Sequence, residues 1–106
     1  MEFNISCEII NSVAKFVLLG ELDASSAGIF RTKIEEIAAQ GPKRLVLIVK
    51  DLTFMASAGL RVLIFAKQKL GTDVPVYIVS PQETILDTLQ KTGFQDSVYI
   101  VSEYTD

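Results

Sequence analysis

The sequence predicts a single α/β domain with a mostly parallel mixed sheet, an N-terminal β-hairpin and helices packed mainly on one face. Three observations support this prediction. A strand-like alternation opens the chain, an unbroken apolar run lies near its middle, and helix-like segments alternate with the later strands. Successive strands that are joined through a helix usually run parallel in one sheet, and the connection between them is right-handed. The expected order is β-β-α-β-α-β-α-β in one domain over 1–106, a length that buries one core but not two.

The first two strands are predicted to form the hairpin. Apolar and polar residues alternate over residues 3–9, which is typical of a strand with one face in water. Asn11 and Ser12 suit a two-residue turn. The second strand is expected over residues 13–19 and ends at Gly20.

A helix and a buried strand follow. Apolar residues recur at helical spacing over residues 24–40, with Asp23 placed to act as the N-cap. Gly41 and Pro42 stop the helix. Residues 45–49 are apolar without alternation, which indicates a central strand covered on both faces.

The middle of the chain is predicted to be a loop, a helix and a strand. Residues 51–56 are interpreted as the loop and residues 57–70 as the helix, which ends at Gly71. A strand over residues 74–79 contains Pro75, so it either lies near an edge of the sheet or begins after the proline.

The last helix has a capping-box pattern at its start. Ser80 would be the N-cap, Pro81 the first helical residue and Glu83 the third. A short strand over residues 98–101 completes the sheet. The acidic tail, residues 102–106, is expected to fray.

Composition restricts the chemistry. The formal net charge of -3 argues against direct nucleic-acid binding, and no apolar run approaches the ~20 residues of a membrane span. The absence of histidine excludes Ser-His-Asp catalysis and ordinary His-ligated metal sites. No phosphate-loop fingerprint is present, so no cofactor is expected. A single cysteine, Cys7, fits a reducing cytoplasm. A binding or regulatory module without catalytic activity is the best remaining class.

The junction before the middle helix is the most informative stretch. Ala56, Ser57, Ala58 and Gly59 are small, so backbone N–H groups at the helix start stay accessible and can stabilise a phosphate. Ser57 could instead simply cap the helix. A hydrolase nucleophile elbow is rejected because Met55 replaces its first glycine and no histidine can act as base.

The middle helix also carries apolar residues outside its core-facing stripe. That stripe consists of Gly59, Val62, Leu63, Ala66 and Leu70. Leu60 and Ile64 lie beside it, close to Arg61. They either form an apolar contact patch for a partner or are covered by another element.

Three stretches resemble the STAS domain of bacterial anti-sigma factor antagonists, and the resemblance covers nearly the whole chain. Residues 20–23, Gly-Glu-Leu-Asp, resemble the turn before the first helix in that family. Residues 51–60, from Asp51-Leu52-Thr53-Phe54-Met55 to Gly59-Leu60, resemble the family's serine signature. Residues 91–94, Lys-Thr-Gly-Phe, resemble its late turn.

The resemblance implies a function. Such proteins bind an anti-sigma factor that is also a serine kinase, and so release a sigma factor that directs transcription. The kinase phosphorylates the antagonist, which then dissociates, and a serine phosphatase reverses the modification. Ser57 matches the acceptor serine.

Ala56 departs from the family, which has aspartate at this position. The alternative is therefore a STAS interaction module without a phosphoryl switch, in a scaffold or a transporter-linked assembly. A small-ligand or nucleotide-binding domain is a weaker third class.

The residues predicted to contact the partner surround Ser57 in the expected fold. They are Asp23, Met55, Ala56, Ala58, Gly59, Leu60, Arg61 and Ile64.

Overall fold

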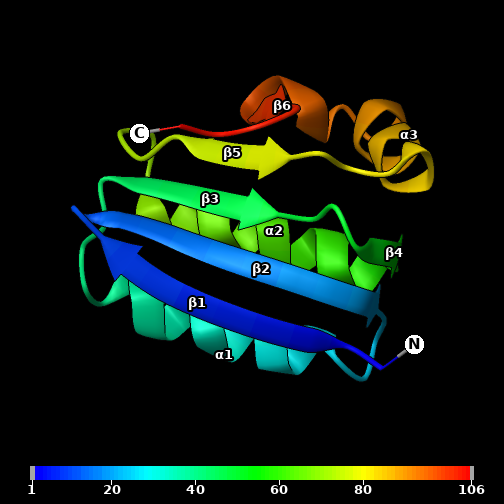
Figure 1. The fold of residues 1–106 in the computed structure, drawn as a ribbon, viewed down its shortest axis with the longest axis horizontal. Coiled ribbons are helices and arrows are strands. Elements are labelled where there is room, and N and C mark those ends of the chain that lie inside the picture. The colour runs from blue at the N-terminus through cyan, green and yellow to red at the C-terminus, as the bar shows by residue number, and fades with distance from the viewer. Residues whose placement is uncertain (1, 106) are drawn as a thin grey trace.

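A computed structural model describes residues 2–105 and shows one mixed sheet backed by helices (Figure 1). The strands in chain order are β1 (Asn4–Ile10), β2 (Val13–Leu22), β3 (Arg44–Ile48), β4 (Leu52–Met55), β5 (Val76–Val79) and β6 (Tyr99–Val101). Their spatial order is β1-β2-β3-β5-β6, and β4 pairs separately with β2. Only the β1–β2 hairpin is antiparallel among these pairs. The predicted fold class is therefore confirmed.

The helices lie mainly on one face of the sheet. Helices α1 (Ala27–Ala38) and α2 (Ser57–Leu70) pack side by side behind the strands in Figure 1. Helix α3 (Glu83–Lys91) and a 3-10 turn, η1 (Phe94–Ser97), lie toward the β4 end and the β6 edge. No helix within residues 2–105 is long and apolar enough to cross a membrane.

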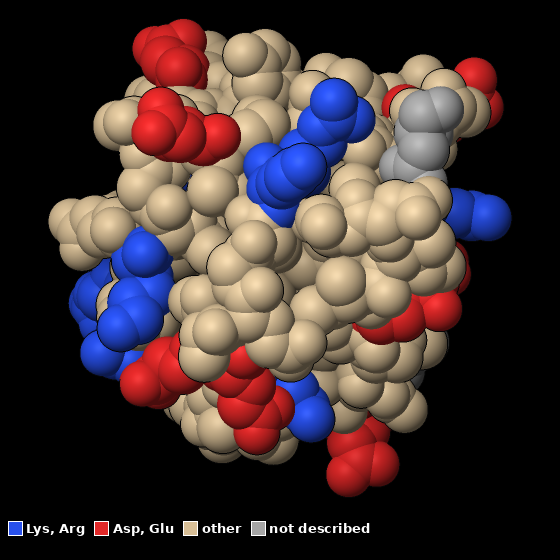
Figure 2. Space-filling view, turned by 90° about the vertical axis from the view of Figure 1, so that its left-hand side faces the viewer, with Lys and Arg blue, Asp and Glu red and all other residues tan. Residues whose placement is uncertain are grey.

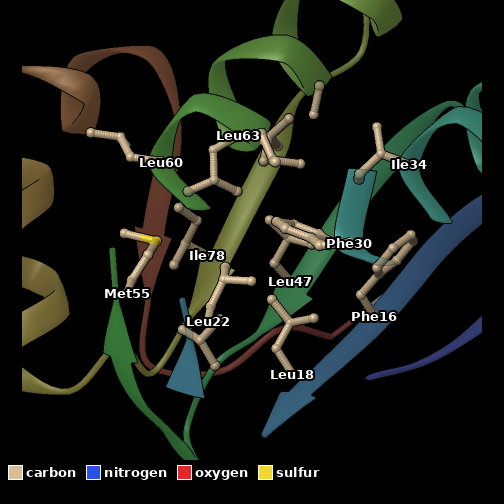
Figure 3. Close-up of a cluster of buried hydrophobic side chains, with 14 of the residues drawn as sticks. Phe16, Leu18, Leu22, Phe30, Ile34, Leu47, Met55, Leu60, Leu63 and Ile78 are labelled. Carbon is tan, nitrogen blue, oxygen red and sulfur yellow. The ribbon is translucent and has the colours of Figure 1, made fainter. Parts of the chain in front are cut away.

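The core fills the space between the sheet and helices α1 and α2. Alternate residues of β2 point into it, and Phe16 meets Phe30 of α1 edge to face with ring centroids 6.2 Å apart (Figure 3). Val62, Leu63 and Ala66 of α2 are also buried there. Cys7 packs partly buried against the same core, and this burial raises the pKa of its thiol. Helix α2 has the predicted bounds, and most of its predicted core-facing stripe is buried, but Leu70 is only half-buried and Leu60, predicted outside the stripe, is buried as well.

The segment interpreted as a loop, residues 51–56, contains strand β4, so that prediction is wrong. Strand β2 continues past Gly20, where φ is +87° and the register with β4 shifts. Leu22 then pairs with Met55, and the Thr53 hydroxyl donates to the Gly20 carbonyl at 3.0 Å. A bulge at a glycine bends a strand without ending it, and the chain uses this bend to add a strand beside the end of β2.

Two helix starts also differ from the predictions. Helix α1 begins at Ala27 instead of Ala24 because the intervening residues form a turn. Helix α3 begins at Glu83, and Gln82 occupies its N-cap position. The predicted capping box at Ser80 is therefore wrong.

Ser80 has a different role at the end of β5. It adopts a left-handed backbone with φ of +55°, and its hydroxyl donates to the carbonyl of Ser102 at 2.6 Å. Its backbone N–H donates to the carbonyl of Val101 at 2.8 Å. Ser80 therefore connects β5 to the end of β6 and does not start a helix.

The tail after β6 contacts the rest of the domain through Ser102 and Tyr104, although the sequence predicts fraying. Besides the Ser102 contact, Tyr104 packs on Tyr77 with ring centroids 5.1 Å apart. The Arg44 guanidinium donates to the Tyr104 hydroxyl at 3.0 Å. Asp106, the last residue of the predicted frayed tail, lies outside the described residues.

Candidate functional site at the start of helix α2

Two chain segments meet where β2 and β4 end. Leu22 and Met55 are paired residues of these parallel strands, and the Ala56 N–H donates to the Leu22 carbonyl at 2.8 Å. Parallel neighbours lie about 4.8 Å apart, and their carboxyl ends share one edge of the sheet. The turn that begins at Asp23 and the first turn of α2 are therefore brought together, as the resemblance implies.

Ser57 is the first residue of α2, and it is exposed. Ala56 occupies the N-cap position with an extended backbone, and no side chain caps this helix start. The first turn also contains no acidic residue. The partial positive charge of the helix N-terminus is therefore not offset by a local carboxylate. A phosphate on the Ser57 hydroxyl would meet a favourable field and accessible N–H donors.

Gly59 allows the first turn of α2 to lie close against β2. A Cβ atom at this position would lie 2.7 Å from Leu22 Cδ2 and 3.0 Å from Met55 Cγ. Leu22 is fully buried, so it has little room to move. The glycine thus fixes the position of the helix start, and with it the position of the Ser57 hydroxyl above the sheet edge.

Asp23 organises the turn that leads to α1. Its Oδ1 accepts from the backbone N–H groups of Ser25 and Ser26 at 3.0 Å each, and from their hydroxyls at 2.8 and 3.0 Å. The Ser25 hydroxyl, followed by the donors of Ser26, holds the pKa of Asp23 below its ordinary value. Asp23 therefore caps the turn before α1 and stays anionic at neutral pH. The N-cap position of the helix itself is Ser26, so the prediction that Asp23 is the helix N-cap is wrong.

Three residues predicted to contact the partner lie beneath the surface. Met55, Gly59 and Leu60 are buried, and the Met55 and Leu60 side chains are each 8% exposed. The predicted contact surface is therefore corrected for Met55 and Gly59, which support it from below, whereas Leu60 reaches solvent only at the floor of a groove beside α2. The accessible members of the predicted set are Asp23, Ala56, Ala58, Arg61 and Ile64.

Leu60 resolves one of the alternatives left by the sequence. It belongs to the main core cluster, and Figure 3 shows it at the margin of that core. Phe94 of η1 belongs to the same core cluster and lines the same groove, so a segment distant in the sequence packs beside Leu60. Ile64, one turn further along α2, stays 40% exposed. Together with Asp23, Ala56, Ser57, Ala58 and Arg61, it forms what we call the Ser57 surface.

Two exposed apolar side chains near this surface were missed by sequence reasoning. Phe54 of β4 is 46% exposed and lies opposite Glu21 in the β2–β4 register. Ile29 in the first turn of α1 is 52% exposed and lines a shallow pocket with Asp23. The sequence does not indicate Phe54, because its segment is predicted to be a loop. In a strand, the alternation with buried Met55 would have indicated an outward-facing side chain.

The opposite end of the molecule carries mixed charge. Figure 2 shows Lys and Arg side chains interspersed with Asp and Glu, without a continuous basic stripe on that face. Binding to a phosphate backbone depends on clustered basic residues, so this face does not suit nucleic acid. Among residues 2–105, no three His, Cys, Asp or Glu side chains gather into a possible metal site.

The uncapped helix start leads to a stability prediction. Ala56→Asp should raise the free energy of unfolding by about 1 kcal/mol, because an N-cap carboxylate can accept from the free N–H groups and favours the helix dipole. Urea titration followed by circular dichroism measures this change. Ala58→Asp is the control, since it adds the same charge inside the first turn without the capping geometry. Equal gains from both variants would show that charge alone, and not a cap, is responsible.

Comparison with known proteins gives a family match. The STAS domain model matches residues 4–105. Anti-sigma-F factor antagonist RsfB of Mycobacterium tuberculosis is 31% identical over 70 residues, which cover 66% of this chain and 57% of RsfB. The chain thus matches little more than half the length of these curated relatives.

Solved structures share the fold at low sequence identity. An anti-sigma factor antagonist from Mycobacterium paratuberculosis superposes with a TM-score of 0.88 at 22% identity, covering 96% of this chain and 87% of that one. SpoIIAA in its unphosphorylated form gives 0.81 at 21% identity, with 94% and 90% covered. The phosphorylated form of Bacillus SpoIIAA gives 0.72 at 21% identity, with 96% and 93% covered.

Proposed function

The chain belongs to the STAS domain family, and from this membership we propose that it is an anti-sigma factor antagonist switched by phosphorylation of Ser57. Its partner would be an anti-sigma factor that is also a serine kinase, and binding that partner would free a sigma factor for transcription. The protein acts by binding and not by catalysis. The anti-sigma-F factor antagonist RsfB and the structural relatives named as antagonists support this proposal.

The single observation that carries the proposal is the placement of Ser57. Its hydroxyl belongs to the first residue of α2, on an exposed position beside the turn formed by Asp23. A kinase can reach a hydroxyl only where the chain leaves it accessible. Transfer of the γ-phosphoryl group of ATP to this oxygen would release ADP, and the hydroxyl proton would pass to a base on the kinase. A serine phosphatase would restore the hydroxyl by hydrolysis.

The phosphate would act on the complex and spare the fold. It adds about -1.5 to -2 charges at neutral pH, and the uncapped N-terminus of α2 favours negative charge. At a partner interface the same dianion must be desolvated, which is unfavourable unless the partner supplies a cation. A loss of a few kcal/mol separates the complex, since each 1.4 kcal/mol changes affinity about tenfold.

Ala56 supports the alternative of a STAS interaction module that lacks the phosphoryl switch. It stands where the family has aspartate, and it is the N-cap of the helix that begins with Ser57. The change removes a carboxylate next to the acceptor hydroxyl. It also removes a possible electrostatic contact with a kinase. Under this alternative the same surface docks a partner constitutively.

Phosphorylation in vitro distinguishes the two functions. The full chain is incubated with ATP and the serine kinase anti-sigma factor from the same genome, and mass spectrometry locates the added phosphate. We expect one phosphate on Ser57 and none on a Ser57→Ala variant. A stable complex that forms without any phosphate transfer would support the unswitched module, and equal labelling of both proteins would reject Ser57 as the acceptor.

A further inference from the structure

An open groove lies between α2 and the segment that links α3 to η1. Its volume is about 290 Å³, and it is lined by Leu60, Ile64 and Lys67 from α2 and by Thr92, Gly93 and Phe94 from the facing segment. Leu60 and Phe94 form an apolar floor, each 8% exposed, whereas Ile64 is 40% exposed at the wall. The groove therefore offers an apolar contact area that the described part of the chain leaves uncovered.

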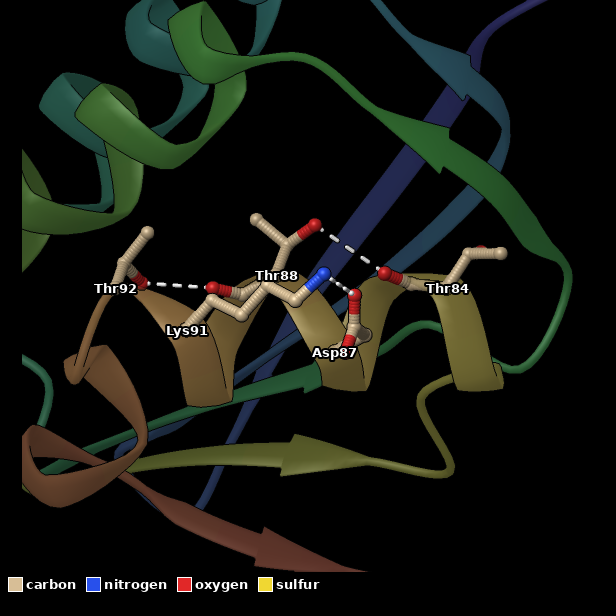
Figure 4. Close-up of polar contacts among 5 residues, drawn as sticks. All are labelled: Thr84, Asp87, Thr88, Lys91 and Thr92. Carbon is tan, nitrogen blue, oxygen red and sulfur yellow. Dashed lines mark hydrogen bonds and ion pairs between the residues drawn. The ribbon is translucent and has the colours of Figure 1, made fainter.

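The charge of the groove comes from α2. Lys67 has no ion-pair partner within residues 2–105. On the facing side, Lys91 is held by Asp87 at 2.9 Å, and the Thr92 hydroxyl donates to the Thr88 carbonyl at 2.8 Å (Figure 4). Asp96 shares an adjoining pocket with Lys67, beyond ion-pair distance. Lys67 is thus the cation that a ligand in the groove would meet.

The groove continues the Ser57 surface along α2. Ser57, Arg61, Ile64 and Gln68 recur at the spacing of a single helical stripe. Ile64 lies about 10 Å from Ser57 along the helix axis, at a rise of 1.5 Å per residue. A partner that docks at Ser57 therefore passes Arg61, a second exposed cation, before it reaches the groove.

We propose that this groove receives an acidic amphipathic helix of the docking partner. An apolar side chain of that helix lies on the Leu60–Phe94 floor beside Ile64, and a carboxylate one turn away pairs with Lys67. Ile64 and Lys67 are themselves one turn apart on α2, so the facing helix can match both contacts at its own i and i+3 or i+4 positions. The groove is open, which suits a protein segment better than a small molecule, since small-molecule sites enclose most of the ligand surface. The identity of the partner rests on the proposed function.

Charge reversal at Lys67 tests the electrostatic contact. Lys67→Glu should weaken the complex with the anti-sigma factor kinase about tenfold, because two carboxylates would then face each other. Lys69→Glu is the matched control, since Lys69 lies in the same last turn of α2 and four residues after Phe65, whose ring contacts Arg31 of α1. Its affinity should stay within about twofold of the wild type. Calorimetric titration measures both, and equal effects of the two variants would overturn the proposal.

Zero-length crosslinking tests the chemistry of the occupant. A carbodiimide joins an amine to a carboxylate in direct contact, so it should link Lys67 Nζ to an Asp or Glu of the partner, which mass spectrometry identifies. Lys67→Arg keeps the cation and cannot form this amide, so it should retain affinity and lose the crosslink. Crosslinks at Lys69 without any at Lys67, or a linked partner segment that is not amphipathic and helical, would refute the assignment.

The failure of this inference can be told apart from failure of the proposed function. If Ser57 is phosphorylated and the complex forms, but Lys67→Glu binds like the wild type, the groove proposal fails and the antagonist function stands. If the kinase neither binds nor modifies the chain, the proposed function fails, and with it the groove's assigned partner.

Discussion

Replacing Leu60 with alanine is expected to lower the free energy of unfolding by about 2–4 kcal/mol, while Ile64→Ala changes it by less than about 1 kcal/mol. Leu60 is 8% exposed and belongs to the main core cluster, whereas Ile64 is 40% exposed. Truncating Leu60 removes buried methyl groups and leaves a void at the margin of the core. Truncating Ile64 removes a side chain that is already partly in contact with water.

Chemical denaturation of the two variants under the same conditions measures this difference. The substitutions are matched, because each removes the side chain of a large aliphatic residue from the same helix, one turn apart. Similar losses at both positions would mean that Leu60 is not packed more tightly than Ile64. The exclusion of Leu60 from the Ser57 surface would then be wrong.

Ser57→Asp is expected to raise the dissociation constant of the partner complex about a hundredfold, which is about 2.8 kcal/mol. The melting temperature should stay within about 2 °C of the wild type, since a carboxylate in the first turn of a helix is neutral or slightly stabilising. Titration calorimetry and thermal melts give the two values. Ser57→Asn is the control, because it has a similar size without the charge, and its affinity should fall far less.

A large drop in melting temperature for Ser57→Asp would contradict the account of an accessible, uncapped helix start. Unchanged affinity with an unchanged melting temperature would instead show that added charge at this position does not affect docking. The two results separate an error about the fold from an error about the switch.

Local patterns were sufficient to predict the elements whose boundaries are set by neighbouring residues. Helix α2 has the predicted bounds because both signals are local. Its apolar residues recur at helical spacing, and Gly71 follows its last residue directly. The first strand pair was also predictable, because the alternation and the Asn11-Ser12 turn are local signals. β5 begins after Pro75, one of the two alternatives that the proline left open.

The errors arose where a distant segment decides the outcome. Strand β4 exists because a bulge at Gly20 carries β2 onward to meet it, and Gly20 alone is equally typical of a strand end. The local pattern at Ser80 predicts a cap, whereas its hydroxyl bonds to the Ser102 carbonyl, which lies far along the chain. Leu60 belongs to the main core cluster together with Phe94, a residue far along the chain, and the helical spacing of apolar residues in α2 cannot reveal this.

The most direct test of the central claim compares the partner's affinity for the phosphorylated and unphosphorylated full chain. Both forms are titrated into the anti-sigma factor kinase, and the phosphorylated sample is titrated again after treatment with a serine phosphatase. The account predicts tight binding, a loss of about a hundredfold on phosphorylation and full recovery after phosphate removal. Equal affinity of the two forms, with mass spectrometry confirming the phosphate on Ser57, would contradict it.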